Sequence, residues 1–221
     1  MIERIAEPEL MDDPQHARAY HEADFSEPHN AFVEHFKERF KDFSRGDVLD
    51  LGCGTCDVVI RFAKVFPDTH ITGIDGSEAM LDIANRELKR HGISDRITII
   101  KAYLPDDIPK KRYDAVISNS LLHHLKDPCI LWRCIKDCAK DTAPIFIVDL
   151  LRPDSFEDAE ALVKRYASEE SPILQRDFFY SLLASYKVEE IKCQLKDNGL
   201  DYLNVEVISD RHVAIWGMFK P

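Results

Sequence analysis

The feature that most constrains this chain is a glycine turn placed directly after a short apolar run. Residues 48–51 (VLDL) predict a buried strand, and Gly52-Cys53-Gly54 ends it before a predicted helix over 55–66. Gly52 and Gly54 permit a tight turn and let a ligand approach the backbone, because neither residue has a Cβ. The free N–H groups at the start of the next helix favour a carboxylate or phosphate. The turn therefore predicts a strand–turn–helix unit that binds a ligand.

The same alternation of strand and helix continues along the chain. Further strands are predicted at 71–74, 97–100, 113–118 and 145–150, and further helices at 77–91 and 128–139. This order is typical of a parallel sheet with right-handed crossovers. The segments 203–208 and 212–219 are also predicted strands, and the three residues between them are too few for a crossover. They are expected to form an antiparallel hairpin.

The segments outside this core are predicted to be mostly helical. After a loose arm over residues 1–13, which lack clear periodicity, one helix is expected from Pro14 and a second from just after Pro28. Two or three helices fill 154–197, broken near Pro172 and Tyr186, and Gly199 ends the last. A chain of 221 residues without repeats or an internal linker suits one domain. We expect its parts to be an N-terminal helical lid (1–45), a cofactor-binding core (46–151), and a helical insert with a closing hairpin (152–221).

The net charge and the cysteines limit the kinds of partner and the cellular compartment that we expect for this chain. The chain has 40 acidic and 29 basic residues, for a net charge of -11. Such a surface repels phosphate backbones, so no nucleic-acid partner is expected. No signal-peptide pattern is seen at the N-terminus, and the longest apolar stretch, 143–151, is too short to span a bilayer. Six cysteines without such a signal predict reduced thiols and a cytoplasmic protein.

An acidic residue about twenty positions after the glycine turn points to a nucleoside ligand. Asp75 stands at the end of the second predicted strand, where a carboxylate can accept hydrogen bonds from both ribose hydroxyls. No third glycine follows Gly54 at the spacing that dinucleotide-binding folds use, and Asp50 precedes the first glycine. Together with the hairpin, these features favour a mononucleoside ligand over NAD(P), although an NAD(P)-linked oxidoreductase stays an alternative.

At this point the chain resembles the class I S-adenosylmethionine-dependent methyltransferases. The resemblance is carried by DLGCGT (50–55), GIDGSEAML (73–81), YDAVISNS (113–120) and LHHL (122–125), and it extends over residues 46–151. It implies an α/β fold: a Rossmann-like three-layer sandwich with a mostly parallel seven-stranded sheet. The last strand would enter antiparallel between the fifth and sixth. The implied cofactor is S-adenosylmethionine, with S-adenosylhomocysteine as the product.

The resemblance assigns cofactor binding to residues near the carboxyl ends of the first four strands: Asp50, Gly52, Cys53, Gly54, Asp75, Gly76, Met80, Ala102, Tyr103, Asn119 and Ser120. Gly52 and Gly54 would line the methionine moiety, with Asp50 near its ammonium group. Asp75 would hold the ribose and Met80 would pack on the adenine.

Two departures from the family pattern affect these roles. Cys56 stands where a third glycine is usual, and residues 101–103 (KAY) replace a Gly-Asp-Ala whose aspartate reads the adenine amino group. Adenine recognition is then assigned to backbone groups, Tyr103, or a carboxylate of Asp106 or Asp107. Asn119 and Ser120 would border the sulfonium.

Several further side chains are candidates for catalysis or substrate binding. His123, followed by His124, comes after the fourth strand and could deprotonate a nucleophile; the alternative is cofactor packing or helix capping. Tyr20 and His21 could close over the cofactor or simply lie on an amphipathic helix. Arg152 could bind a substrate carboxylate or form an ordinary surface salt bridge.

The cysteine pairs have spacings that zinc sites use, Cys53 with Cys56 and Cys134 with Cys138. Zinc would require both pairs to converge, whereas one lies in the glycine turn and the other on a later helix. Buried, reduced cysteines are the preferred interpretation, and no metal is predicted.

The predicted function is methyl transfer from S-adenosylmethionine to a small-molecule nucleophile by in-line displacement. The Asn119-Ser120-Leu121 segment lacks the Pro-Pro typical of enzymes that methylate base amines, in agreement with the acidic charge. A protein methyltransferase and a non-catalytic cofactor-binding regulator stay open as alternatives.

Overall fold

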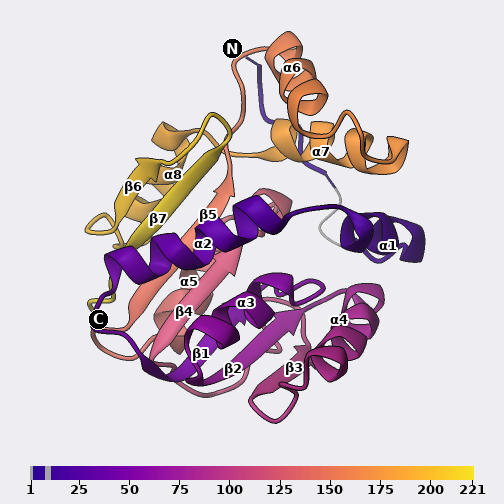
Figure 1. Ribbon diagram of the computed structural model, residues 1–221. Helices are drawn as coiled ribbons and strands as arrows, with labels where there is room; N and C mark the ends of the chain where they lie inside the picture. Colours follow the sequence, from indigo (N-terminus) through magenta and orange to yellow (C-terminus); the bar gives the residue numbers. More distant parts are fainter. Residues whose placement is uncertain (1, 8–10) are drawn as a thin grey trace.

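The computed structural model describes residues 2–7 and 11–221. Its described strands form one sheet in the order β3-β2-β1-β4-β5-β7-β6 (Figure 1). Strands β1 to β5 pair in parallel, and β7 is antiparallel to both β5 and β6. This confirms the predicted seven-stranded sheet, including the entry of the last strand between the fifth and sixth.

The strands lie close to their predicted positions. They are β1 (Arg45–Leu51), β2 (Asp68–Asp75), β3 (Ile97–Lys101), β4 (Ala115–Asn119), β5 (Pro144–Leu150), β6 (Asn204–Val207) and β7 (His212–Met218). The helices are α1 (Pro14–Glu22), α2 (Ser26–Arg39), α3 (Asp57–Val65), α4 (Glu78–His91), α5 (Cys129–Cys138), α6 (Phe156–Tyr166), α7 (Pro172–Ala184) and α8 (Val188–Asp197), with a 3-10 turn, η1 (Leu122–His124).

The expected start of α2 after Pro28 is wrong. The helix begins at Ser26 because proline is tolerated in a first helical turn, where its missing N–H has no intrahelical role.

Helices cover both faces of the sheet, and each face has its own hydrophobic core. On one face Phe36 of α2 packs against Phe62 of α3 and Phe146 of β5, with ring centroids 4.9 and 5.9 Å apart. On the other face Trp132 of α5 is fully buried and belongs to one cluster with Leu195 of α8. Burial of each such ring contributes about 2 kcal/mol. The two cores produce the three-layer arrangement that holds the strand ends at one edge.

The capping residues of α4 follow their predicted roles. Ser77 is the N-cap and accepts a hydrogen bond from the Met80 N–H at 3.2 Å. Gly92 ends the helix in a left-handed conformation with φ 65°. A short polar side chain and a glycine therefore set both ends of this helix, as their sequence positions indicate.

Residues 2–7 with α1, α6 and α7 form a layer that we call the cover. Figure 1 shows α1 and α7 beyond the carboxyl ends of the parallel strands, and α1 contacts both α4 and α7. The Ile2 N–H donates to the Asp154 carbonyl at 3.2 Å and the Ile5 N–H to the Leu183 carbonyl at 3.1 Å. The prediction of a loose arm is therefore wrong for residues 2–7, because distant carbonyls satisfy its backbone. Residues 1 and 8–10 of that arm lie outside the described residues.

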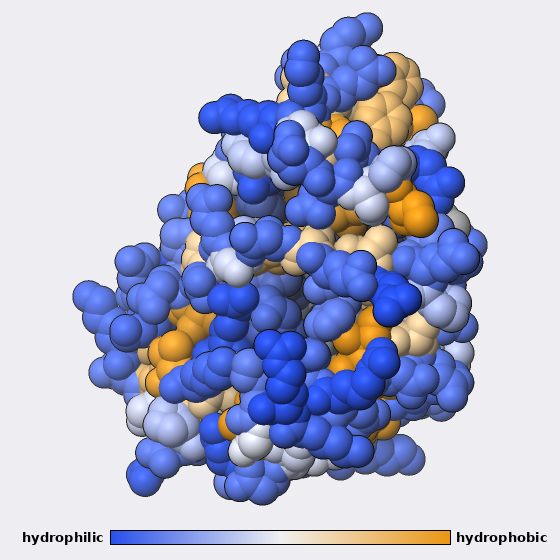
Figure 2. All heavy atoms as spheres, turned by 45° about the vertical axis from the view of Figure 1, so that its right-hand side comes forward, coloured by the Kyte–Doolittle hydropathy of each residue, from blue (hydrophilic) through white to orange (hydrophobic). Residues whose placement is uncertain are grey.

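The face of the molecule in Figure 2 is mostly hydrophilic, with separate apolar patches. No helix within the described ranges combines the length and the apolar character that crossing a membrane requires.

Candidate functional site

The glycine turn is tied to the neighbouring strand by its own backbone. The N–H groups of Gly52 and Cys53 both donate to the Ile74 carbonyl, at 2.8 and 2.9 Å. Gly52 has φ 77°, and a Cβ there would lie 2.9 Å from the Leu121 side chain. Gly54 has φ 51°, and a Cβ there would meet nothing within 4 Å. Packing within the protein thus requires the first glycine, whereas the second faces open space that a ligand can enter.

Asp75 is held beside this turn at the end of β2. Its Oδ2 accepts a hydrogen bond from the Gly54 N–H at 2.9 Å, and its Oδ1 accepts one from the Ser77 N–H at 2.8 Å. Burial raises the pKa of the Asp75 carboxyl, although these N–H groups and that of Gly76 act in the opposite direction. The carboxylate predicted to bind the ribose is therefore fixed in place before any ligand arrives.

Asp50 is the least satisfied acidic group of the site. Its side chain is buried, and its Oδ1 has no hydrogen-bond partner among the described residues. Burial, with the nearby charge of Asp75, raises the pKa of the Asp50 carboxyl well above its usual range. A buried acceptor without a partner is unfavourable unless a donor or a cation supplies one. The ammonium group of a methionine moiety fits this requirement.

Cys56 occupies the position of the usual third glycine in an unusual conformation. It is the N-cap of α3 with φ 66°, and it is fully buried. A side chain in this left-handed region costs about 1–2 kcal/mol. A hydrogen bond to Cys56, followed by burial, raises the pKa of the Cys53 thiol. Both thiols are buried and pack within the turn, and within the described ranges no cysteine belongs to a metal-binding cluster.

The structure separates the two residues of the predicted lid. Tyr20 packs with Met80 against Ala17, so α1 brings it next to the proposed adenine site. Burial, with the charges of Asp57 and Asp75, raises the pKa of the Tyr20 hydroxyl. His21 is not a member of this cluster, and its Nε2 lies 3.6 Å from Glu87 Oε1 on α4.

The remaining cofactor candidates lie along the same edge of the sheet. Ala102 is buried and its N–H donates to the Asp75 carbonyl at 3.1 Å, whereas the side chain of Tyr103 is exposed. Asn119 ends β4, and its Nδ2 donates to Ser120 Oγ at 3.2 Å. Ser120 has φ 55°, a strained value for a residue with a side chain. The strand ends thus bring most of the predicted set together.

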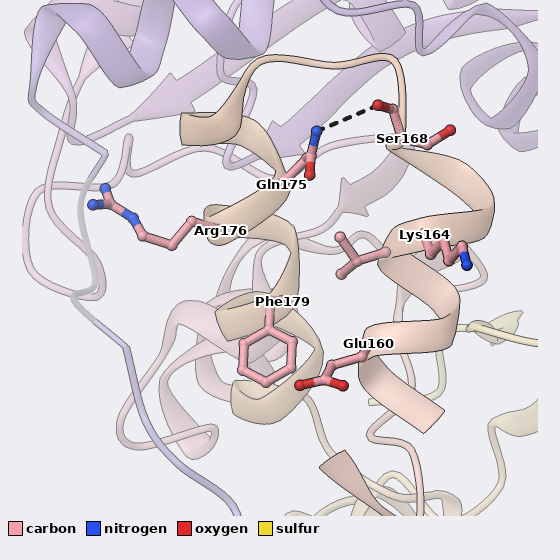
Figure 3. Close-up of a pocket in the computed structure, with 7 residues that line it drawn as sticks. Glu160, Lys164, Ser168, Gln175, Arg176 and Phe179 are labelled. Atoms are coloured by element: carbon pink, nitrogen blue, oxygen red, sulfur yellow. Dashed lines mark hydrogen bonds between the residues drawn. The ribbon is translucent and has the colours of Figure 1, made fainter. Parts of the chain in front are cut away.

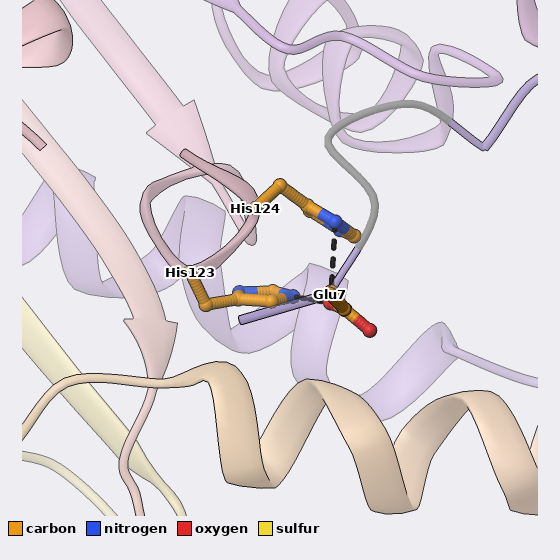
Figure 4. Close-up of side chains that lie close together, drawn as sticks. All are labelled: Glu7, His123 and His124. Atoms are coloured by element: carbon orange, nitrogen blue, oxygen red, sulfur yellow. Dashed lines mark ion pairs between the residues drawn. The ribbon is translucent and has the colours of Figure 1, made fainter. Parts of the chain in front are cut away.

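His123 is almost fully buried, whereas its position after the fourth strand made it a candidate base for a nucleophile. Its side chain is 2% exposed, its Nδ1 is 2.6 Å from Asp149 Oδ1, and its Nε2 is 3.5 Å from Glu7 Oε1 (Figure 4). Burial alone would lower the pKa of His123, but Asp149 and Glu7 raise it. Both ring nitrogens face protein carboxylates, and the role of His123 as a base for the nucleophile stays a prediction. His124 is more open, and its Nδ1 lies 3.2 Å from Glu7 Oε1.

Sequence reasoning missed Glu7 and Asp149 as site residues. Asp149 offered a signal, since it is a lone acid within an otherwise apolar strand. Its carboxylate accepts hydrogen bonds from the Leu122 and Leu150 N–H groups at 2.7 and 2.8 Å. Although burial opposes ionisation, His123 lowers the pKa of Asp149. Glu7 offered no local signal, because only the folded chain brings the N-terminal segment to η1.

Arg152 forms an ion pair and a hydrogen bond within the protein. Its Nη2 donates to Glu190 Oε1 at 2.6 Å and its Nη1 to the Ser185 carbonyl at 3.0 Å, and the side chain is buried. Of the two predicted roles, the structure therefore favours the salt bridge, although the guanidinium is buried rather than on the surface. The guanidinium ties the end of β5 to the start of α8.

A surface groove of about 480 Å³ lies between α6 and α7 (Figure 3). Its lining comes from these two helices and the turn between them: Glu160, Val163, Lys164, Ser168, Gln175, Arg176 and Phe179. No residue at the carboxyl ends of the strands contributes to it. The groove is therefore separate from the glycine turn and its carboxylates.

Comparison with known proteins agrees with this geometry. Residues 48–144 match a family described as a methyltransferase domain. The chain is 39% identical over 72 residues to the ribosomal protein uL3 glutamine methyltransferase of Francisella tularensis, a match that covers 33% of this chain and 23% of that protein. It is 26% identical over 173 residues to the 27-O-demethylrifamycin SV methyltransferase of Amycolatopsis mediterranei, covering 76% of this chain and 59% of that protein.

Solved structures of other proteins have a similar fold. A SAM-dependent methyltransferase from Aquifex aeolicus superposes with a TM-score of 0.65 at 18% identity, over 93% of this chain and 98% of that one. The matches to the first curated relatives cover less than a third of the length of those proteins. The family match over residues 48–144 contains the glycine turn, Asp75 and η1.

Proposed function

This chain carries a class I S-adenosylmethionine-dependent methyltransferase domain, and from that premise we propose that it methylates a small-molecule nucleophile by in-line displacement. The observation that carries the proposal is the pairing of a fixed carboxylate, Asp75, with a buried acceptor that lacks a partner, Asp50 Oδ1. Between them the turn at Gly54 leaves open space. Asp75 suits the ribose hydroxyls, Asp50 suits the ammonium group, and the open space at Gly54 suits the methionine moiety.

The residues of this chain would hold the cofactor and orient the acceptor. When bound, S-adenosylmethionine supplies a methyl group activated by the positive charge on sulfur. Asp50 would bind its ammonium group, Asp75 the ribose hydroxyls, and Met80 with Tyr20 the adenine. Asn119 and Ser120 would border the reacting end. Placing a nucleophile in line with the methyl group accounts for much of the rate in such a reaction.

The cover and the buried carboxylates would contribute water exclusion and proton handling. The proton that a nucleophile releases needs an acceptor within reach of the site. His124 is the most open member of the group around η1, and Glu7 links it to the buried His123–Asp149 pair. We therefore assign the acceptor role to this group as a unit, with His124 as the residue nearest to solvent.

A small-molecule substrate in the cytoplasm is the favoured assignment. The net charge of -11 opposes nucleic acid, and the cover extends over the strand ends as a lid for a small substrate would. The relative named for 27-O-demethylrifamycin SV supports this class. The six free cysteines support a reducing compartment.

A protein substrate is the second candidate, favoured by the relatives named as ribosomal-protein and release-factor glutamine methyltransferases. The two candidates differ in how they use the cover. A protein segment needs an open edge, so opening the cover by mutation would raise the rate on a protein substrate and lower it on a small one.

The test is calorimetric titration with S-adenosylmethionine, S-adenosylhomocysteine and NAD(H). Micromolar binding of the first two is expected, and Asp75→Ala should weaken it by about 100-fold, since two ribose hydrogen bonds to a charged acceptor are lost. Asp95→Ala, a change of an exposed aspartate, is the matched control. Preference for NAD(H), or equal affinity in both variants, would sink the proposal.

A further inference from the structure

Glu7, His123 and His124 converge although they come from opposite parts of the chain. Within the described ranges they are the one group of three metal-binding side chains whose ligand atoms all lie within 4.8 Å of one another (Figure 4). Glu7 Oε1 lies 3.5 Å from His123 Nε2 and 3.2 Å from His124 Nδ1. The two imidazole centroids are 4.2 Å apart. An imidazole N–H can donate a hydrogen bond to a carboxylate, but each imidazole ring and the carboxylate also offer lone pairs, so the cluster can hold a shared cation, either a proton or a metal ion.

Two of these side chains are oriented by a second hydrogen bond. His123 Nδ1 is 2.6 Å from Asp149 Oδ1. Because this carboxylate is fixed by two backbone N–H groups, it holds the proton on Nδ1 and leaves Nε2 directed at Glu7. Ser181 Oγ donates to Glu7 Oε1 at 3.0 Å. A metal-bound histidine commonly donates its other ring N–H to a carboxylate, which fixes the orientation of the ring.

The spacing fits zinc. Ligands about 2.0–2.2 Å from a tetrahedral zinc ion lie about 3.3–3.6 Å from one another. The two contacts of Glu7 Oε1, at 3.5 and 3.2 Å, are close to this range. Two imidazoles with one carboxylate favour zinc or a similar transition metal over magnesium or calcium, which prefer oxygen ligands.

We propose that Glu7, His123 and His124 bind a zinc ion beside the carboxyl end of β4. The three ligands leave a fourth position open, and the partial exposure of His124 and Glu7, at 19% and 12%, provides access to it. Zinc binding itself is independent of the methyltransferase proposal, but a bound ion takes the lone pairs that the group otherwise offers to a proton, so the metal would then replace the group in that role. If that proposal holds, a thiol or hydroxyl of the substrate could occupy the fourth position, where the metal would lower its pKa.

The experiment titrates the full chain with Zn²⁺ alone, after treatment with a chelator and without cofactor. One ion per chain is expected, and Co²⁺ in the same site should show the strong visible absorption of a tetrahedral complex. Glu7→Gln keeps the shape of the side chain and removes its charge, and it should weaken binding by at least about tenfold. His124→Asn should abolish the Co²⁺ absorption.

The control is Glu87→Gln on α4. Glu87 also contacts two histidines, His21 at 3.6 Å and His91 at 3.9 Å, but these groups do not form a cluster with converging ligand atoms. This variant should bind Zn²⁺ as the unmodified protein does. Asp149→Asn, which changes a positioning residue, should weaken binding by about tenfold while the stoichiometry stays at one.

Two results would overturn the proposal. One is the absence of stoichiometric Zn²⁺ binding by the folded protein up to about 100 μM, which is weaker than ordinary protein zinc sites. The other is equal binding by the Glu7→Gln and unmodified chains, which would place the ion on other groups such as the cysteines. Titration with S-adenosylmethionine on the same samples distinguishes these failures from failure of the methyltransferase proposal.

Discussion

The glycine turn and the cover meet at the same edge of the sheet. The hydrogen bonds that hold them differ in how far apart the bonded residues lie along the sequence. The Gly54 N–H reaches Asp75 across 21 positions, within one strand–helix–strand unit. The cover depends on contacts across most of the chain. Arg4 donates to the carbonyl of Ala184, 180 positions away, and to those of His123 and Leu125, 119 and 121 positions away.

This difference separates what each region contributes. The turn is complete within a local unit, so its geometry depends on strand and helix formation and on glycine at two positions. Residues 2–7 of the cover reach their hydrogen-bond acceptors only when the chain around η1, residue 154 and α7 has folded, because the acceptors lie there. We therefore expect the cofactor-binding turn to tolerate changes in the cover, and the two regions to respond to different mutations.

Substitution of the two glycines should produce the largest effects and separate packing from binding. Gly52→Ala combines a left-handed φ with a clash against Leu121, and it should lower the free energy of unfolding by about 3 kcal/mol. Gly54→Ala meets no protein atom and should lower it by about 1 kcal/mol. Its methyl group would occupy the open space, so cofactor affinity should fall by at least about tenfold. Urea unfolding and calorimetry measure both quantities, and equal stability losses would show that the two glycines have the same role.

Release of the N-terminal segment should have an intermediate effect. Arg4→Met removes three hydrogen bonds to carbonyls and the stacking of the guanidinium on Tyr186, at 4.2 Å from the ring centroid. We expect a loss of about 2 kcal/mol in the free energy of unfolding and faster proteolysis near the N-terminus.

Cofactor affinity should nevertheless stay within about threefold in Arg4→Met, a difference below 1 kcal/mol. Arg18→Met is the control, because Arg18 forms an exposed ion pair with Glu22 on α1. A collapse of cofactor affinity in Arg4→Met would show that the turn and the cover act as one unit.

The two lid candidates should give the smallest effects, and unequal ones. Tyr20→Leu should weaken cofactor binding by about fivefold, roughly 1 kcal/mol, because the ring packs beside Met80. His21→Ala removes only a contact of 3.6 Å with Glu87 and should change the free energy of unfolding by less than about 0.5 kcal/mol. Equal binding losses in the two variants would place His21 in the site as well.

Prediction from the sequence was correct where a residue type is required by the local backbone conformation alone. Gly92 and Ser77 marked the ends of α4 correctly because capping is a local requirement. It left alternatives open where one side chain had several possible partners. Arg152 is equally suited to a substrate carboxylate and to Glu190, and only the docking of α8 beside β5 selects the second.

The sequence by itself determined the order of strands and helices, the glycine turn, Asp75 and the closing hairpin, because hydrophobic periodicity and turn chemistry act over a few residues. Only the tertiary structure decided that Glu7 meets His123 and His124, that Asp149 lies behind His123, and that residues 2–7 are bound to α7. The contacts of residues 2–7 join segments more than 100 positions apart, as between Glu7 and Ser181 across 174 positions, whereas Asp149 and His123 are 26 positions apart. No local pattern encodes such pairings, since they depend on how the packed layers bring the N-terminal segment to η1 and α7.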